Sequence, residues 1–139
     1  MMTRLGLGAL LVLGLAQLVP VERMNPPLDG EVPAGEEVRQ ILRRSCYDCH
    51  SNESRWPWYA YVAPVSWLIA HDVGEAREHM NFSTWNAYDA EERREKLEEA
   101  WEEVEEGEMP LWFYLPLHPD ARLSEDDKRV LRAWATGAG

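Results

Sequence analysis

Cys46-Tyr47-Asp48-Cys49-His50 is the stretch around which the fold of this 139-residue chain is organised. Two thiols three residues apart can each form a thioether with a vinyl group of haem, and the adjacent histidine can bind the iron. The sequence holds no other cysteine, which excludes a framework of several disulfides. The stretch therefore predicts one covalent haem, haem c, on Cys46 and Cys49, with His50 as the proximal iron ligand.

Other uses of a C-x-x-C stretch compete with haem attachment. A thioredoxin-like redox site occurs in a βαβ context, which this sequence lacks. A disulfide within the stretch would leave His50 without a role. A zinc site needs four ligands, and the two cysteines with His71 and His79 could supply them, but the spacing of that histidine pair fits a zinc finger poorly. A zinc or thiol-redox module is therefore the non-haem alternative.

Met109 is the first candidate for the distal iron ligand. It follows a predicted helix, precedes Pro110, and lies 59 residues after His50, a separation that lets its loop fold over the far haem face. A thioether stabilises ferrous iron and raises the reduction potential, which suits electron transfer. Taken alone, such a methionine is as often a core residue.

His71 is the main rival for the distal position. It shares the apolar face of a predicted helix with Trp67 and Gly74, and the glycine would leave room for a haem edge. A histidine on such a face is more often a hydrogen-bonded core residue. We expect His118 to fix its loop and His79 to be exposed.

The haem propionates need hydrogen-bond donors near the attachment site. Arg43, Arg44 and Arg55 flank that site, and the indole N–H groups of Trp56 and Trp58 are further candidates. An ordinary surface role for the three arginines is the alternative.

Residues 1–19 form an N-terminal segment that predicts export or attachment to a membrane. Arg4 precedes an apolar run from Leu5 to Leu15, the pattern of a secretory signal with a weak cleavage site after Ala16. An uncleaved membrane anchor is the second interpretation, although the run is short for a full span. A buried helix of the domain is the third. Residues 20–33, rich in proline, read as a linker or wrapping segment, and residues 34–139 as the haem-binding domain.

Helical spacing of apolar residues predicts an all-α domain with long ordered loops. We expect the second helix to be capped by Ser66, the third to end at Gly107, and the last to be capped by Ser124. No segment alternates at period two. The predicted helices span about residues 34–45, 66–79, 86–106 and 125–136.

Charge limits the class of partner. The net charge is −11, which argues against nucleic acid because phosphate binding needs basic patches. Residues 86–108 hold eleven acidic residues against three basic ones. Most of this charge is explained as the solvated face of a helix, and the alternative is a docking surface for a basic redox partner. Membrane contact is expected only through the N-terminal segment.

Several longer motifs resemble a known family. They are C-x-x-C-H-S-N, W-P-W-Y, A-P-V-S-W, N-F-S-x-W and G-E-M-P, and the likeness runs from about Asn25 to Trp134. The sequence resembles the bacterial haem-binding domain family of cytochrome c-like proteins. The resemblance implies a cytochrome c-like α fold wrapped around one haem, His50 as proximal ligand, Met109 in the distal position and an N-terminal export or anchor segment. Ser54 and Ala76 stand where members often have threonine and glycine.

Two functions of different classes remain open at this point. The first is a single-haem electron-transfer cytochrome of the cell envelope, not an enzyme, with His50 and Met109 as axial ligands. It would be periplasmic, either free or tethered to the inner membrane. The second is a haem peroxidase or a gas or redox sensor, with the distal side open or occupied by His71.

Overall fold

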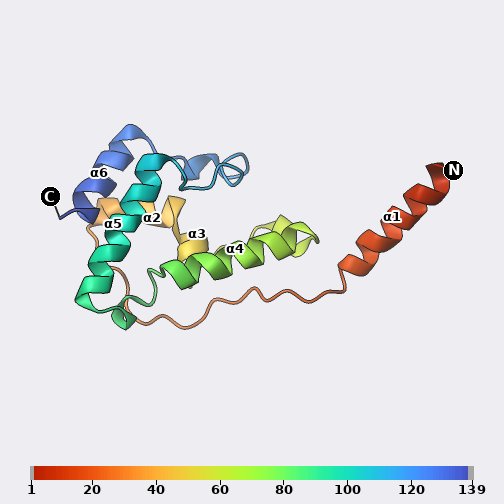
Figure 1. The fold of residues 1–139 in the computed structure, drawn as a ribbon, viewed down its shortest axis with the longest axis horizontal. Helices are drawn as coiled ribbons and strands as arrows, with labels where there is room; N and C mark the ends of the chain where they lie inside the picture. The colour runs from red at the N-terminus through yellow and green to blue at the C-terminus, as the bar shows by residue number, and fades with distance from the viewer. Residues whose placement is uncertain (1, 138–139) are drawn as a thin grey trace.

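The described part of the chain is built from helices and loops only. The computed structural model describes residues 2–137, and no strand occurs within them (Figure 1). The α-helices are α1 (Met2–Ala16), α2 (Glu36–Ser45), α3 (Tyr47–His50), α4 (Val65–His79), α5 (Ala90–Glu106) and α6 (Glu125–Ala135). Short 3-10 helices are η1 (Trp58–Tyr61), η2 (Trp85–Ala87) and η3 (Pro119–Ala121). The prediction of an all-α protein is confirmed.

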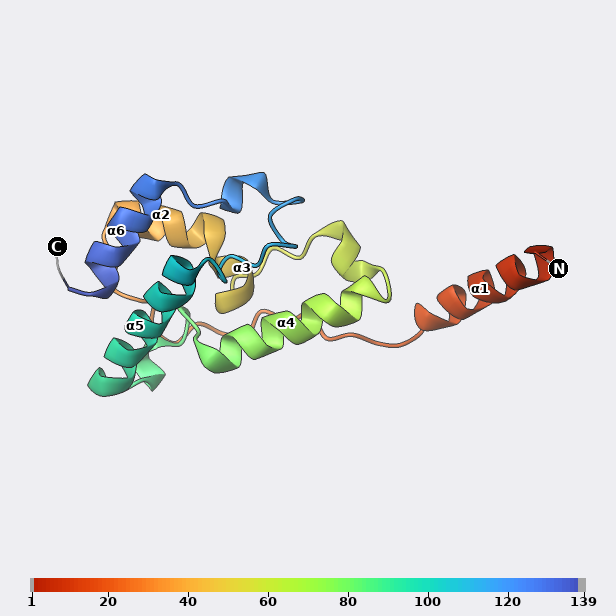
Figure 2. The ribbon, with the colours of Figure 1, turned by 45° about the horizontal axis from the view of Figure 1, so that its top comes forward.

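Helix α1 projects away from the other helices, at the end of the molecule opposite α5 and α6 (Figures 1 and 2). Its Leu7, Leu10 and Leu11 side chains are 65–72% exposed. The interpretation of this segment as a buried helix of the domain is therefore wrong. Within residues 2–137, no helix combines the length and the apolar character needed to cross a membrane.

Capping side chains decide where the two C-terminal helices begin. Asp89 accepts hydrogen bonds from the backbone of Glu91 and Glu92 and starts α5, and Ser124 forms a reciprocal capping box with Asp127 that starts α6. The predicted cap at Ser66 is wrong: α4 starts one residue earlier, and Ser66 is buried inside its first turn.

The linker residues 20–33 lie along the domain without regular secondary structure. Asp29 donates its backbone N–H to Ser83 (2.7 Å) and Val32 to Phe82 (3.0 Å), and Trp85 donates back to Gly30 (3.1 Å). Val32 is buried in the core. These bonds fasten the chain before α2 to the chain after α4.

An aromatic stack forms the part of the core that supports the Cys46–His50 stretch. The ring of Tyr47 stacks on Phe82 at 5.4 Å, and Phe82 on Trp85 at 6.4 Å. The backbone N–H of Phe82 donates to the carbonyl of His50 (2.8 Å). All three rings are buried, so the position of His50 is held by close-packed core side chains.

Candidate functional site: a haem-sized cavity

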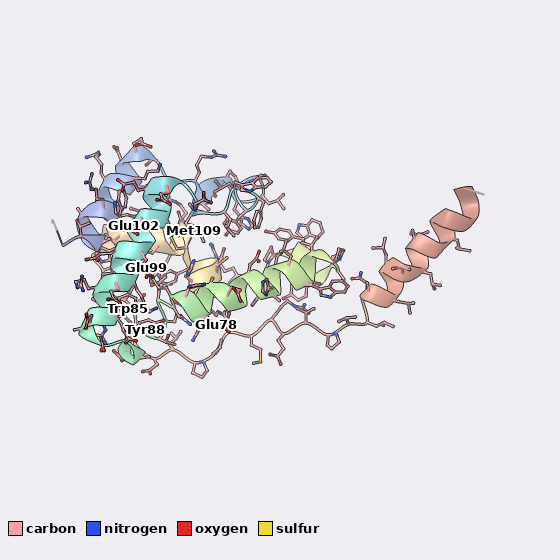
Figure 3. All side chains as sticks on the ribbon, viewed as in Figure 1. Glu78, Trp85, Tyr88, Glu99, Glu102 and Met109 are labelled. Carbon is pink, nitrogen blue, oxygen red and sulfur yellow. The ribbon has the colours of Figure 1, made fainter. Side chains whose placement is uncertain are left out.

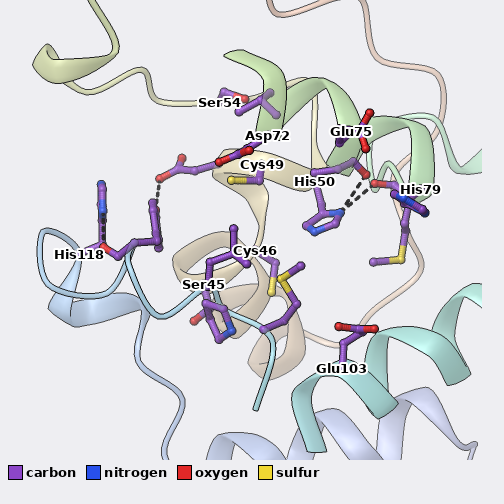
Figure 4. A pocket seen from close by; sticks show the side chains of 18 of the residues that line it. Ser45, Cys46, Cys49, His50, Ser54, Asp72, Glu75, His79, Glu103 and His118 are labelled. Atoms are coloured by element: carbon purple, nitrogen blue, oxygen red, sulfur yellow. Dashed lines mark hydrogen bonds between the residues drawn. The ribbon is translucent and has the colours of Figure 1, made fainter. Parts of the chain in front are cut away.

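One helical turn carries both thiols and the imidazole. Helix α2 ends where the N–H of Cys46 donates to Leu42 (2.8 Å), and the N–H of His50 then donates to the carbonyl of Cys46 (2.9 Å). Both cysteines are free thiols. In Figure 4 the side chains of Cys46, Cys49 and His50 surround the same space. The predicted attachment residues therefore share one site.

The ring of His50 is oriented by two backbone carbonyls. Its Nδ1 lies 3.1 Å from the carbonyl oxygens of Ala76 and of Met80 (Figure 4). Both neighbours are acceptors, so we assign the proton to Nδ1, which leaves a lone pair on Nε2. Burial lowers the pKa of His50, although the two carbonyls oppose the shift, and the imidazole is neutral near pH 7. A neutral ring fixed through Nδ1 is the form that binds a metal through Nε2.

His50 faces a cavity of about 1010 Å³ that is lined mainly by apolar atoms. This volume lies at the upper end of the range of about 300–1,000 Å³ that is usual for small-molecule sites. The walls come from segments far apart in sequence. They are the turn of residues 46–50, which we call the attachment turn after its predicted role, α4, α5 and the loop after α5. Cys46, Cys49, His50 and Met109 all line it. A group as large and flat as haem fits both the volume and the apolar lining.

Burial suppresses ionisation of the two thiols. It raises the pKa of Cys46 to about 12 and that of Cys49 to about 11, and a neighbouring charge adds to each shift. Reactive cysteines of thiol-redox sites have lowered pKa values. The environment of this pair is therefore the opposite of the one that thiol-redox chemistry needs.

The end of α5 delivers Met109 to the cavity wall. Gly107 adopts the left-handed conformation, with φ of +82°, and turns the chain back. The backbone N–H of Met109 then donates to the carbonyl of Glu103 (3.1 Å), so the methionine stays attached to the last turn of the helix. Figure 3 shows Met109 at this end of α5, beside the attachment turn. The prediction that Gly107 ends this helix is confirmed.

A polar clamp joins the loop that follows Met109 to the attachment turn. We use this name for Asp48, Arg55, Tyr114 and His118. The Tyr114 hydroxyl donates to Asp48 (3.0 Å), which also accepts two side-chain bonds from Arg55 (3.1 and 3.2 Å). The ring of His118 stacks on Tyr114 at 3.8 Å and hydrogen-bonds the Tyr59 hydroxyl. His118 thus fixes its loop, as predicted.

The sequence predicts an exposed His79 and a His71 on the apolar face of its helix, and α4 confirms only the first. His71 and His79 are exposed, and both reach the cavity. Gly74 does not line the cavity, and a Cβ there would meet no atom within 4 Å. The idea that Gly74 makes room for a haem edge is therefore wrong, because the helix turns that residue to solvent. Within residues 2–137 no three His, Cys, Asp or Glu side chains group to hold a metal ion, which contradicts the zinc alternative.

The candidate propionate donors separate into two groups. Arg43 pairs with Glu31 and Glu53, and Arg44 with Asp127, and neither arginine lines the cavity. Their expected role as propionate donors is not supported by this placement, because nearby carboxylates already neutralise them. Arg55, Trp56 and Trp58 do line the cavity.

Two buried polar atoms in the cavity wall lack a partner. The indole Nε1 of Trp56 and the hydroxyl of Ser45 make no hydrogen bond with any described residue. Buried polar groups are usually satisfied, so an unpaired donor in a cavity wall indicates an acceptor on a bound group. Together with the neutral imidazole, these donors fit a haem with its carboxylates.

A buried polar network behind the attachment turn was missed by the sequence analysis. Arg77 donates to the Ser51 carbonyl (2.9 Å), the Ser54 hydroxyl (2.9 Å), the Met24 carbonyl and Asn25. The side-chain amide of Asn81 donates to that of Asn52 (2.8 Å), and the Ser83 hydroxyl accepts the N–H of Asn52 (3.0 Å). The signal was present in the H-S-N and N-F-S motifs, whose polar residues hold the linker, the attachment turn and the end of α4 together.

The comparisons with known proteins add one match. Residues 11–137 match the family described as haem-binding domain. No curated protein and no solved structure matches the chain.

Proposed function

The chain belongs to the haem-binding domain family, and on that premise we propose that it is a single-haem c-type cytochrome of the cell envelope that carries electrons. Cys46 and Cys49 would hold one haem by thioethers, and His50 and Met109 would be its axial ligands. Cys46, Cys49 and His50 lie on one turn, and these three residues and Met109 all line one cavity.

The orientation of His50 is the observation that carries the proposal. Its Nδ1 proton is committed to the carbonyls of Ala76 and Met80, so Nε2 is the nitrogen left for iron. The backbone carbonyls come from a helix and its end, which hold the ring at a fixed angle before any ligand is bound. Such preorganisation lowers the ordering cost of binding.

Met109 is favoured over His71 because of where each one is attached. The carbonyl of Ala76 that accepts the Nδ1 hydrogen bond belongs to α4, so α4 lies behind the His50 ring, on the proximal side of the site. His71 lies on that same helix. Met109 enters from the end of α5 (Figure 3), a different wall of the cavity. The distal position needs a residue from a different wall.

The residues around the cavity suit reversible electron transfer. The iron of a bound haem would supply a one-electron change between its ferrous and ferric forms. Met109 would stabilise the ferrous form through its sulfur, while the apolar lining excludes water and disfavours additional charge. The neutral His50 would bind without giving up or taking up a proton.

The acidic face of α5 is a proposed docking surface for a basic redox partner. Glu99, Glu102 and Glu103 line the cavity, and Figure 3 shows Glu99 and Glu102 along α5, which leads to Met109. Two basic residues of α5 are already used inside the protein, because Arg93 and Lys96 donate to the backbone carbonyls of Trp85 and His79. These acceptors are neutral carbonyls, so both cations still offset part of the acidic charge. Residues 86–108 nevertheless hold eleven acidic residues against three basic ones, and encounter rates should therefore fall as salt rises.

An extracytoplasmic location completes the proposal. The apolar N-terminal segment with Arg4 supports export, with the domain either released or tethered by α1. Haem c attachment in that compartment would require both thiols of the C-x-x-C-H stretch.

The test is the absorption spectrum of the ferric and the reduced protein, made with a c-type maturation system, for the wild type and two variants. We expect a low-spin spectrum with a weak sulfur-to-iron charge-transfer band that Met109→Ala removes. The matched control is Met24→Ala, since Met24 is exposed in the linker. A band that survives Met109→Ala would contradict distal ligation by this residue, and absence of covalent haem would contradict the proposal as a whole.

The same spectrum, together with carbon monoxide binding, distinguishes a second candidate function from the electron carrier. His71 reaches the cavity from an exposed position, which would suit an acid–base group of a peroxidase or a gas sensor. A high-spin ferric spectrum and rapid carbon monoxide binding to the reduced wild type would favour that candidate over the electron carrier.

A further inference from the structure

Three exposed apolar side chains lie where η1 joins α4, and the cavity does not explain them. Tyr61, Val62 and Trp67 are 57%, 44% and 40% exposed. None of the three lines the cavity, so a ligand that fills the cavity would leave them uncovered. We call these three residues the outer apolar edge.

The chain around this edge is free of acidic residues. Residues 54–71 contain no Asp or Glu, in a protein that has 25 of them. The nearest cation on the edge is Arg23, whose guanidinium lies 4.5 Å from the ring centre of Tyr61 and donates to the carbonyl of Ala60 (3.2 Å). Arg23 is preceded by the exposed Glu22, so the edge is apolar with little net charge. It differs from the acidic α5 and does not match a basic protein partner.

Hydrogen bonds connect the edge to the apolar helix α1. The side-chain amide of Gln17 donates to the carbonyl of Ala63 (3.2 Å) and accepts the N–H of the same residue (3.0 Å). These bonds join the end of α1 to the loop between η1 and α4, next to Val62. Figures 1 and 2 show α1 projecting from this end of the molecule.

After Arg4, the sequence of helix α1 is apolar on every side. The consecutive residues Leu10 to Leu13 point in four directions around the helix and are 48–69% exposed. A helix made to bind a protein groove has one apolar face, whereas one with no polar face suits a lipid environment. Because Gln17 joins the end of α1 to the chain beside Val62, a lipid surface that takes up α1 also contacts the outer apolar edge.

We infer that the outer apolar edge docks on the surface of a phospholipid bilayer in which α1 is embedded. Tyrosine and tryptophan favour the boundary between headgroups and acyl chains, because their rings are apolar and their N–H or O–H groups remain hydrated. Arg23 would lie at the level of the phosphates. Docking at this edge turns α5 away from the membrane and leaves its acidic face open. The inference goes beyond the proposed electron transfer and does not depend on which residue binds the iron.

The experiment uses the full haem-loaded chain in phosphatidylcholine vesicles that contain a photoreactive phosphatidylcholine, with its reactive group on the acyl chain near the headgroup. Lipid adducts are mapped by mass spectrometry after tryptic digestion. We expect adducts on α1 and, within peptide 56–77, at Tyr61, Val62 and Trp67. Peptide 97–122, which contains half of α5 and Trp112, should carry none.

A pair of variants makes the test specific. The change Tyr61→Ser with Trp67→Ser should lower the adducts in peptide 56–77 roughly tenfold, since it removes two rings from the contact. The matched control is Trp112→Ser, because Trp112 is 79% exposed and does not line the cavity. An unchanged haem spectrum shows that each variant is folded and separates this test from that of iron ligation. Adducts confined to α1, adducts spread over α5, or an equal loss in both variants would each overturn the inference.

Discussion

Replacing Tyr114 by phenylalanine should loosen the loop that carries Met109 without disturbing the core. The change removes one hydrogen bond, from the Tyr114 hydroxyl to Asp48 (3.0 Å), and keeps the ring that stacks on His118. Asp48 is not left unsatisfied, because it still accepts bonds from the backbone N–H and the guanidinium of Arg55. The variant therefore isolates one contact of the polar clamp.

The expected magnitude follows from that environment. Hydrogen bonds to charged groups contribute about 1.5–3 kcal/mol, and the larger values apply when the charge is left without a partner. Asp48 retains three bonds from Arg55, so the lower end, about 1.5 kcal/mol, applies. This corresponds to a population of the open loop that is roughly tenfold larger.

Two assays report the opening of the loop. If Met109 binds the iron as proposed, added imidazole should displace it from the ferric protein at a concentration roughly tenfold lower than in the wild type. Amide hydrogen exchange in residues 111–118 should accelerate by a similar factor, and this measurement does not depend on the ligand of the iron. The control is Tyr61→Phe, since the Tyr61 hydroxyl makes no hydrogen bond with a described residue. Exchange and imidazole affinity within twofold of the wild type, or an equal change in Tyr61→Phe, would refute the role of the clamp.

Three further predictions concern stability, each measured as the free energy of unfolding in urea. Arg77→Lys should destabilise the protein by about 2–3 kcal/mol, because an ammonium group cannot replace the guanidinium bonds to four acceptors; a loss below about 0.5 kcal/mol, typical of an exposed pair, would contradict this. Gly107→Ala should lower the free energy of unfolding by about 1 kcal/mol, since the φ of Gly107 is +82°. Gly74→Ala should raise it by roughly 0.5–1 kcal/mol, because Gly74 lies inside α4 with open space around it. Changes of the same sign in the two variants would be inconsistent with the structure. Burial opposes ionisation of Asp127, but hydrogen bonds from Ser124 and the charge of Arg44 lower its pKa. Its folded pKa lies below its unfolded value, so it stabilises the protein above about pH 4 and this contribution disappears as the pH falls through the folded pKa. Asp127→Asn should therefore weaken the dependence of stability on pH below about pH 4. An unchanged dependence of the unfolding free energy on pH in that range would count against this role of Asp127.

The linear sequence predicts α2, α4, α5 and α6 to within four residues at each end, but not the short helix α3. The spacing of Leu97, Trp101 and Val104 predicts α5, and Ser124 predicts the start of α6, because amphipathic spacing and capping act within one or two turns. The C-x-x-C-H stretch is equally local, since all its groups lie on one turn. Ser66 failed as a cap because the chain before it packs as a turn that already begins the helix at Val65.

Long-range placement was decided by the tertiary structure alone. The carbonyls that fix His50, the clamp between Asp48 and Tyr114, and the bonds of Arg77 to the linker join residues 23 to 66 positions apart. The spacing of these residues in the sequence does not predict the contacts, because the contacts form only after distant segments have packed together. The sequence by itself determined which groups could bind haem, and the packing of α4 and α5 around the attachment turn decided which of them face one cavity. The physical reason is that helix formation and capping depend on neighbours in the chain, whereas a cavity is defined by the side chains that remain around it when the core closes.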